Sequence, residues 1–317
     1  MMDFAAPPTK GRRPGLGSAL VIAGFVLLTK APYLVLGPLA LLLLLSRPTS
    51  AREWFWIALS LAVSVYAFRG DGDLVERTVR AMGVVAGGTF VGLSIWLRKA
   101  VFTRAGLAVL VATAAIVIWG LSLGLTLSGF EKAVQDQLAG SYQELLAGQP
   151  TGEASNDVRD FLQWGIDTAP QVARVFAAII VLETVAGLIL AWIWYHRIAQ
   201  RPLGDPAGRF RDFRFNDHLV WGAIITLGLV LFPLPEPAAH AVLDLLVIWM
   251  VLYAARGLAV LATLAALWPG PLKVLALLVA VPLAPFVLAT LVMIGLADTW
   301  MDIRARIASA LTGGTKP

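Results

Sequence analysis

The feature that most constrains this chain is a run of apolar residues from Gln171 to His196 with a single carboxylate, Glu183, near its middle. The run is long enough to cross a bilayer as a helix, which takes about 20 residues. A charge at the centre of such a helix costs on the order of 3 kcal/mol, so Glu183 is expected to face protein or water rather than lipid. The run therefore predicts a membrane helix with a polar contact inside the bilayer.

The rest of the chain repeats this apolar pattern in blocks of membrane length. Hydrophobic residues make up 58% of the 317 residues and charged residues only 14%, against about 25% charged in soluble domains. Nine apolar runs are candidates for membrane segments, at 16–29, 32–45, 54–69, 81–97, 105–128, 171–196, 218–233, 239–268 and 272–297. We predict an all-α fold, a polytopic transmembrane helical bundle of eight or nine segments.

The loops between these runs alternate between basic and acidic, which predicts orientation because Lys and Arg favour the cytoplasmic side. The amino-terminal residues and three later loops are basic, and they hold Lys10, Arg12, Arg13, Arg47, Arg52, Arg98, Lys99, Arg104, Arg201, Arg209 and Arg211. We expect a multi-pass protein of the bacterial cytoplasmic membrane, with its N-terminus in the cytoplasm. Nine crossings would leave Arg304 and Arg306 outside, against this rule. We therefore expect the last run to be broken or re-entrant near Pro282 and Pro285.

The longest polar stretch divides the chain. We predict N-terminal membrane helices over residues 1–128, an extracytoplasmic insertion over 129–170, and C-terminal membrane helices with a tail over 171–317. Within the insertion, apolar residues recur at helical spacing from Val134 to Leu145 and from Val158 to Ile166. This spacing predicts two amphipathic helices, with Pro170 separating the second from the membrane helix. The two helices could cover a substrate path as a lid or simply pack at the membrane interface.

Several chemistries are excluded or disfavoured. The chain has no cysteine, so disulfides, thiol nucleophiles and cysteine-ligated metals are excluded. Its histidines, His196, His218 and His240, lie at predicted helix ends without metal-ligand spacing. Ser122 sits in a Gly-x-Ser-x-Gly pattern, but within an apolar helix, where the strand and turn of that motif cannot form. We expect no enzyme activity, no cofactor and no metal. The net charge of +5 lies in short loops and does not indicate a nucleic-acid partner.

Four charged residues on apolar helices form the predicted intramembrane polar site. Glu183 and Arg256 lie near the middle of helices that run in the same direction in this scheme, so we predict that they are neighbours. Arg174 and Asp244 form a second candidate pair near the outer face. Arg174 and Glu183 are half a turn out of phase, so at most one pair is expected to be direct. A buried ion pair that fixes helix register and a proton, cation or ligand site both remain open.

The tail of the chain, GLADTWMDIR, contains Asp298, Trp300, Asp302 and Arg304. Together with Phe213-Arg214-Phe215 and Gly257-Leu258-Ala259, it resembles the YybS-like family of predicted bacterial membrane proteins, a family of unknown function. The resemblance covers mainly the last third of the chain. It implies a multi-pass membrane protein with a distant relation to the substrate-binding subunits of energy-coupling factor vitamin transporters.

The sequence departs from that family pattern at two places. Asn216 and Asp217 stand where a proline is expected, and Arg256 stands where a glutamine is expected. The second departure means that a pair between Glu183 and Arg256 would not be a device of the whole family.

Two functions follow from these patterns. The first is a small-molecule-binding or transporter-like membrane subunit, with the lipid bilayer, a small ligand and a membrane or cytoplasmic protein as partners. The second is a non-transporting scaffold or assembly protein of the cell envelope. A cavity of several hundred Å³ reaching Glu183 would favour the first, whereas tight packing there and an exposed apolar patch on the outer helices would favour the second.

Overall fold

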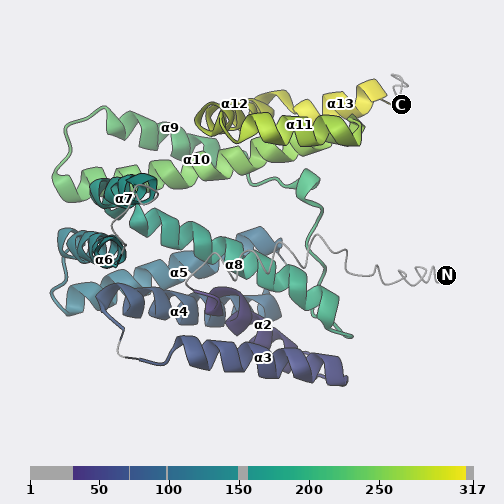
Figure 1. The fold of residues 1–317 in the computed structure, drawn as a ribbon. Helices are drawn as coiled ribbons and strands as arrows, with labels where there is room; N and C mark the ends of the chain where they lie inside the picture. The colour runs from purple at the N-terminus through teal and green to yellow at the C-terminus, as the bar shows by residue number, and fades with distance from the viewer. Residues whose placement is uncertain (1–30, 71, 98, 149–155, 312–317) are drawn as a thin grey trace. The chain divides into compact units, whose positions relative to one another are not determined.

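The computed structural model describes residues 31–70, 72–97, 99–148 and 156–311. In these residues all of the regular secondary structure is helical (Figure 1). The first predicted segment, 16–29, and the cations before it lie outside the described residues. The α-helices are α2 Tyr33–Leu45, α3 Ala51–Ala67, α4 Leu74–Trp96, α5 Val101–Ser122, α6 Leu127–Ala147, α7 Asn156–Arg174, α8 Phe176–Ile198, α9 Leu219–Val230, α10 Glu236–Leu264, α11 Gly270–Ala280, α12 Ala284–Met301 and α13 Ile303–Leu311. Two short 3-10 helices are η2 Phe210–Asp212 and η3 Ala265–Leu267. The all-α prediction is confirmed.

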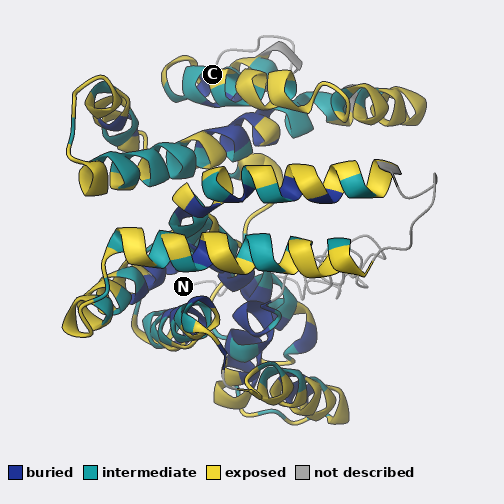
Figure 2. Cartoon of the chain, turned by 60° about the vertical axis from the view of Figure 1, so that its left-hand side comes forward, coloured by how far each residue is buried: buried dark blue, intermediate teal, exposed yellow. Residues whose placement is uncertain are grey.

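Five of the described helices, α4, α5, α8, α10 and α12, are long and apolar enough to cross a membrane. Three shorter apolar helices, α2, α9 and α11, have fewer residues than the ~20 that a full crossing takes. Large apolar side chains are exposed along these helices, including Leu110 and Ile118 on α5 and Leu277 on α11. Figure 2 shows exposed residues along much of the length of several helices. Such faces are suited to lipid and indicate an integral membrane protein. The predicted number of eight or nine crossings is not confirmed.

The predicted break in the last apolar run is present. Helix α11 ends at Ala280 and α12 begins at Ala284, with Pro282 between them. Pro285 lies in the first turn of α12, where the missing N–H of proline costs little because that N–H would have no helical partner.

The two helices predicted in the insertion, α6 and α7, are confirmed, but the predicted boundary at Pro170 is wrong. Helix α7 continues through Pro170 to Arg174, and α8 begins at Phe176. The reason is packing on both sides of the proline, because Leu162, Ala169 and Ala173 form a buried stripe along α7. Tertiary burial of this stripe outweighs the one hydrogen bond that the proline removes.

Contacts divide the described chain into two compact units. Unit 1 contains α2, α3, α4 from Val79, α5 as far as Ala112 and α8 from Ala186. Unit 2 contains the remaining parts of those three helices together with α6, α7 and α9 to α13. The candidate sites described below both lie in unit 2.

Unit 1 is organised around α2. A methyl group on Gly83 of α4 would lie 2.9 Å from the Leu34 side chain and from the Tyr33 ring, and one on Gly87 would lie 3.1 Å from Pro38. Small residues thus let α4 approach α2 closely. Leu34, Leu39, Leu42 and Leu43 of α2 are fully buried.

Unit 1 also holds a buried carboxylate at the start of α3. Ser50 and Glu53 form a capping box, and Glu53 accepts the backbone N–H groups of Thr49 and Ser50, both at 2.9 Å. Its other oxygen accepts the N–H of Gln200 at 2.8 Å. Burial by itself raises the pKa of Glu53, but the hydrogen bonds from Gln200, Ser50 and Thr49 outweigh burial and lower the pKa from 4.5 to about 2. Glu53 is therefore held ionised by N–H groups, with no ion pair among the described residues.

Candidate functional site

In unit 2, helices α10 and α12 meet backbone to backbone at two glycines. A methyl group on Gly257 would lie 1.9 Å from the carbonyl oxygen of Leu291, and one on Gly295 would lie 2.0 Å from that of Tyr253. No real side chain tolerates such distances, so only glycine fits at both positions. Arg256 precedes Gly257, and Asp298 lies about one turn after Gly295. The close approach of the helices brings these two charged residues within hydrogen-bond distance.

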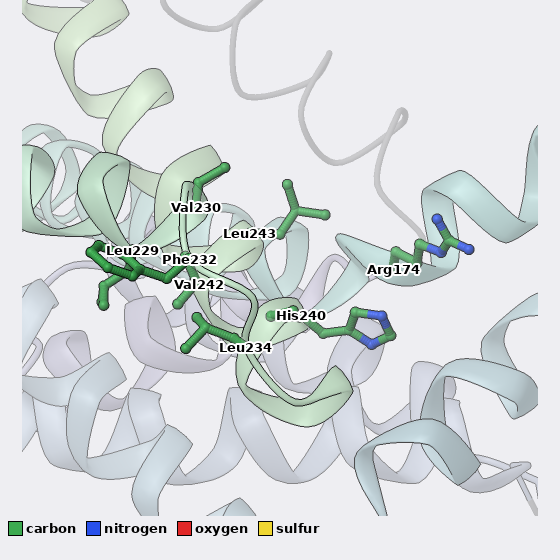
Figure 3. Close-up of a pocket in the computed structure, with 9 residues that line it drawn as sticks. Arg174, Leu229, Val230, Phe232, Leu234, His240, Val242 and Leu243 are labelled. Carbon is green, nitrogen blue, oxygen red and sulfur yellow. The ribbon is translucent and has the colours of Figure 1, made fainter.

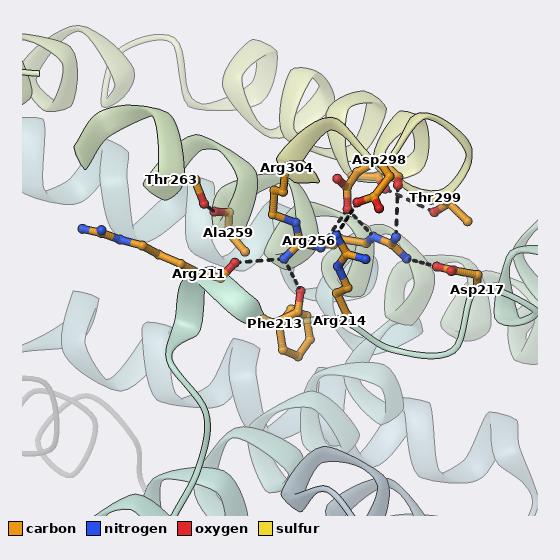
Figure 4. Close-up of polar contacts among 12 residues, drawn as sticks. Arg211, Phe213, Arg214, Asp217, Arg256, Ala259, Thr263, Asp298, Thr299 and Arg304 are labelled. Carbon is orange, nitrogen blue, oxygen red and sulfur yellow. Dashed lines mark hydrogen bonds and ion pairs between the residues drawn. The ribbon is translucent and has the colours of Figure 1, made fainter. Parts of the chain in front are cut away.

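Asp298 is the centre of an ion-pair cluster formed by Arg256, Asp298, Arg304 and Asp217 (Figure 4). Its Oδ2 accepts Arg256 Nε at 3.0 Å and an Arg304 guanidinium N–H at 2.8 Å. The side chain of Asp298 is fully buried and that of Arg256 is 1% exposed. Among the described residues, Asp298 Oδ1 and Arg304 Nε have no hydrogen-bond partner. Each buried charge nevertheless faces an opposite charge, which burial of ions requires.

Arg304 also fixes the loop that precedes α9. Its second guanidinium nitrogen donates to the backbone carbonyls of Arg211 and Phe213, at 2.9 and 3.0 Å. Between α12 and α13, Asp302 adopts the left-handed region at φ 41°, which aspartate tolerates. The carboxylate of Asp302 pairs with Arg214. The carboxyl-terminal helix therefore lies at the same end of unit 2 as part of the predicted inner basic loop.

The tail residues thus divide into two kinds. Asp298, Asp302 and Arg304 each bind a residue of the loop or of α10, whereas Trp300 is exposed and takes no part in the cluster. The interpretation that these charged residues bind another loop agrees with these contacts.

Two residues that the sequence analysis marked as unusual, Arg256 and Asp217, contact each other. Arg256 NH1 donates to Asp217 Oδ1 at 2.7 Å, and the carboxylate of Asp217 is 60% exposed. Asp217 was the one member of the cluster that the sequence did not mark as functional, although it was marked as unusual.

The predicted pair between Glu183 and Arg256 does not form. Arg256 is engaged by Asp298 and Asp217, and among the described residues Glu183, which is half-buried, has no hydrogen bond or ion pair. Matched depth in the membrane fixes only the height of a charge, whereas its partner depends on which face of each helix is turned inward. Here the glycine contact turns Arg256 towards α12.

A second candidate site is an apolar pocket between the end of α9 and the start of α10, here called the α9–α10 pocket. Its volume is about 220 Å³, and it is lined by Arg174, Leu229, Val230, Phe232, Leu234, Ala239, His240, Val242 and Leu243. Figure 3 shows Arg174 and His240 on one side of the pocket and the apolar side chains of α9 on the other. The pocket does not include Glu183.

The predicted pair between Arg174 and Asp244 does not form either. Asp244 Oδ1 accepts the backbone N–H of Ala178 at 3.0 Å. Ala178 lies in the first turn of α8, where an N–H has no helical acceptor, so Asp244 serves as a cap from a neighbouring helix. Arg174 has no ion pair or hydrogen bond among the described residues and is left to line the pocket.

His240 is oriented by a partner that sequence reasoning missed. Its Nδ1 donates to Glu131 Oε1 of α6 at 2.8 Å. The sequence placed His240 at a helix end without a partner, because Glu131 lies more than a hundred positions earlier in the chain. Only the folded chain brings the first turns of α6 and α10 together.

Apolar helices of membrane length, a buried charge cluster at one end and a small pocket define a helical integral membrane protein. Residues 33–299 match the family described as predicted membrane protein DUF2232, and the chain belongs to that family. No curated protein and no solved structure matches the chain.

Proposed function

We propose that this protein is a small-molecule-binding membrane subunit, without catalytic activity, whose ligand enters the α9–α10 pocket. The observation that carries the proposal is an apolar pocket lined by an arginine that has no carboxylate partner in the part of the chain that the structure describes. Ligand sites are concave, mainly apolar, and contain a few polar groups that orient the ligand. Transport of the bound molecule would be the natural use of such a site among membrane helices.

The charges around the pocket indicate the ligand class. Arg174 supplies a permanent positive charge, and His240 exposes the ring edge that Glu131 does not bind. An acidic group would pair with Arg174, while its apolar part would contact Leu229, Phe232 and their neighbours. With a volume of 220 Å³, below the roughly 300 Å³ of common ligand pockets, the site fits a short-chain or single-ring acid.

The test uses hexanoate as the probe and hexan-1-ol as its uncharged counterpart. We expect hexanoate to raise the unfolding temperature of the purified protein in a saturable way, because ligands that bind only the folded state stabilise it. Replacing Arg174 by Ala should weaken hexanoate binding by about tenfold or more, the value of a charged hydrogen bond. Binding of hexan-1-ol should be unchanged in that variant.

Two further variants separate the pocket from general effects. Arg159→Ala removes a charge from the same helix, α7, at a position that does not line the pocket, and should leave hexanoate binding intact. Ala239→Leu fills the pocket and should abolish binding of both probes. The proposal fails if hexanoate gives no saturable stabilisation, or if Arg174→Ala binds it as well as the original protein does.

A scaffold role in the cell envelope is favoured by one observation. Helix α7 carries Val158, Phe161 and Trp164 as an exposed apolar stripe beside its buried stripe, and the rings of Phe161 and Trp164 stack at 6.1 Å. Such a stripe suits a protein partner. It equally suits insertion of a helix into the lipid interface.

Quenching of tryptophan fluorescence distinguishes these two uses of α7. The protein is reconstituted with brominated lipids, and the difference between the original protein and Trp164→Phe isolates the emission of Trp164. Strong quenching of this component would place the stripe in lipid and remove the support for a scaffold. Unquenched emission would favour a protein partner.

The YybS-like name and the distant relation to energy-coupling factor subunits stay predictions from the sequence. The same holds for the bacterial cytoplasmic membrane and the orientation of the termini.

A further inference from the structure

The segment Arg209 to Phe215, RFRDFRF, alternates basic and aromatic residues immediately before α9. Its aromatic side chains connect the surface with the interior of unit 2. Phe210 stacks on Phe213 at 6.2 Å, and Phe215 packs edge-on against Tyr253 of α10 at 5.2 Å. Phe215 is buried, whereas Phe210 is 50% exposed. The segment is therefore anchored at one end and open at the other.

The backbone of this segment is held by the ion-pair cluster while its arginine side chains are left outside. Arg304 binds the carbonyls of Arg211 and Phe213, and Figure 4 shows the Arg211 side chain extending away from the cluster. Arg209 and Arg211 are exposed, and their guanidinium groups have no ion pair or hydrogen bond among the described residues. Two permanent charges and one phenyl ring thus share an exposed surface.

The depth of this surface follows from its contacts. Tyr253 and Arg256 lie about three and two turns before the end of α10, which ends at Leu264, and one turn rises about 5.4 Å. Phe215 packs against both residues, with the Arg256 guanidinium 5.4 Å from its ring. Phe215 therefore lies about 12 to 17 Å from the end of α10 along the helix axis, and Arg209 to Arg211 precede it on the loop that the sequence predicts at the inner membrane surface.

We propose that Arg209, Arg211 and Phe210 form a binding site for the headgroup of an anionic phospholipid. The guanidinium groups would pair with the phosphate and Phe210 would insert beside the acyl chains, which is how basic and aromatic residues divide a membrane interface. Asp212, the acid within the segment, opposes this charge. The site is separate from the α9–α10 pocket.

The absence of cysteine permits a site-specific test. Gly208 is exposed and has open space around it, so Gly208→Cys gives a unique position for a polarity-sensitive fluorophore beside the segment. The labelled protein in non-ionic detergent is titrated with dihexanoyl phosphatidylglycerol, and separately with dihexanoyl phosphatidylcholine. We expect the anionic lipid to shift the emission at a concentration about thirtyfold lower, since each arginine near an anionic lipid contributes a factor of about five.

Paired variants separate charge from structure. Arg209→Ala with Arg211→Ala should move the phosphatidylglycerol response to the concentration that phosphatidylcholine requires, whereas Arg209→Lys with Arg211→Lys should keep most of the preference. Lys132→Ala with Arg159→Ala removes the same charge from α6 and α7 and should change nothing. Phe210→Ala should weaken the binding of both lipids by the same factor.

Three results would overturn the proposal. The first is an equal response to the two lipids in the original protein. The second is a preference for phosphatidylglycerol that survives loss of both arginines in a protein whose unfolding temperature is unchanged. The third is a full emission shift produced by inorganic phosphate at the same concentration, which would identify a free-anion site in place of a lipid site.

Discussion

The ion-pair cluster and the α9–α10 pocket both contain arginine, but they treat its charge in opposite ways. In the cluster, Arg256 and Arg304 converge on the buried carboxylate of Asp298. At the pocket, Arg174 is one of the lining residues and has no carboxylate partner among the described residues, because Asp244 caps α8 instead. A charge that is matched within the protein holds elements together, whereas an unmatched charge beside a cavity is available to a ligand.

Removing Asp298 should have the largest effect on stability, because it removes the carboxylate that both arginines of the cluster share. Asp298→Ala leaves two arginines buried without their shared carboxylate, which is expected to cost about 3 to 5 kcal/mol of unfolding free energy. Chemical unfolding of the purified protein in micelles measures the loss. Asp217→Ala is the matched control, since its carboxylate is 60% exposed and Arg256 keeps Asp298. An Asp298→Ala protein within 1 kcal/mol of the original would show that the cluster is not structural.

Substitutions at the glycine contact should have the next largest effect on the unfolding free energy. Gly257→Ala or Gly295→Ala places a methyl group against the backbone of the facing helix, and overpacking of this kind costs about 1 to 3 kcal/mol. The control is Gly228→Ala in α9, where nothing lies within 4 Å, and where alanine should be neutral or stabilising by up to about 1 kcal/mol. Equal stability of all three variants, measured by the same unfolding assay, would contradict the close approach of α10 and α12.

Glu53 of unit 1 sharpens the comparison, because this buried carboxylate is matched by N–H groups and not by arginine. Glu53→Gln should cost about 1 kcal/mol at neutral pH, the usual value of a helix cap. The lowered pKa also sets a pH dependence. The stability that the ionised group provides is fully present above pH 4.5 and is lost as the pH falls from about 4.5 through about 2.

The difference in unfolding free energy between the original protein and Glu53→Gln isolates this titration from that of other carboxylates. The difference should shrink across that window and be constant above it. A difference that stays constant down to pH 2 would show that Glu53 is not held ionised.

The helices could be predicted from the sequence because hydropathy and proline are local signals. The apolar runs locate α8, α9 and α10, and Pro282 and Pro285 locate the break between α11 and α12. Pro170 shows the limit of this reasoning, because a buried stripe on α7 extends the helix through it. A proline therefore ends a helix only where the residues on its two sides do not pack as one continuous buried stripe.

The partners of the charges could not be predicted, because they depend on how each helix is rotated and on loops that return from elsewhere. Arg256 and Glu183 have similar predicted depth, but the contact at Gly257 and Gly295 selects Asp298. Arg174 and Asp244 also have similar depth, and the free N–H of Ala178 competes successfully for Asp244. Hydropathy shows neither how a helix is rotated nor which groups compete for a charge. The four residues of the predicted site therefore lie in four different environments.

The smallest predicted effect is the one that separates the two sites most clearly. Arg174→Ala should change the unfolding free energy by less than about 0.5 kcal/mol, because its side chain is exposed and has no ion pair or hydrogen bond within residues 31–70, 72–97, 99–148 and 156–311. The same variant should lose the stabilisation that hexanoate gives the original protein, and both values come from unfolding curves with and without the probe. If Arg174→Ala proved as destabilised as Asp298→Ala, then its charge would be structural, and the distinction between matched and available arginines would fail.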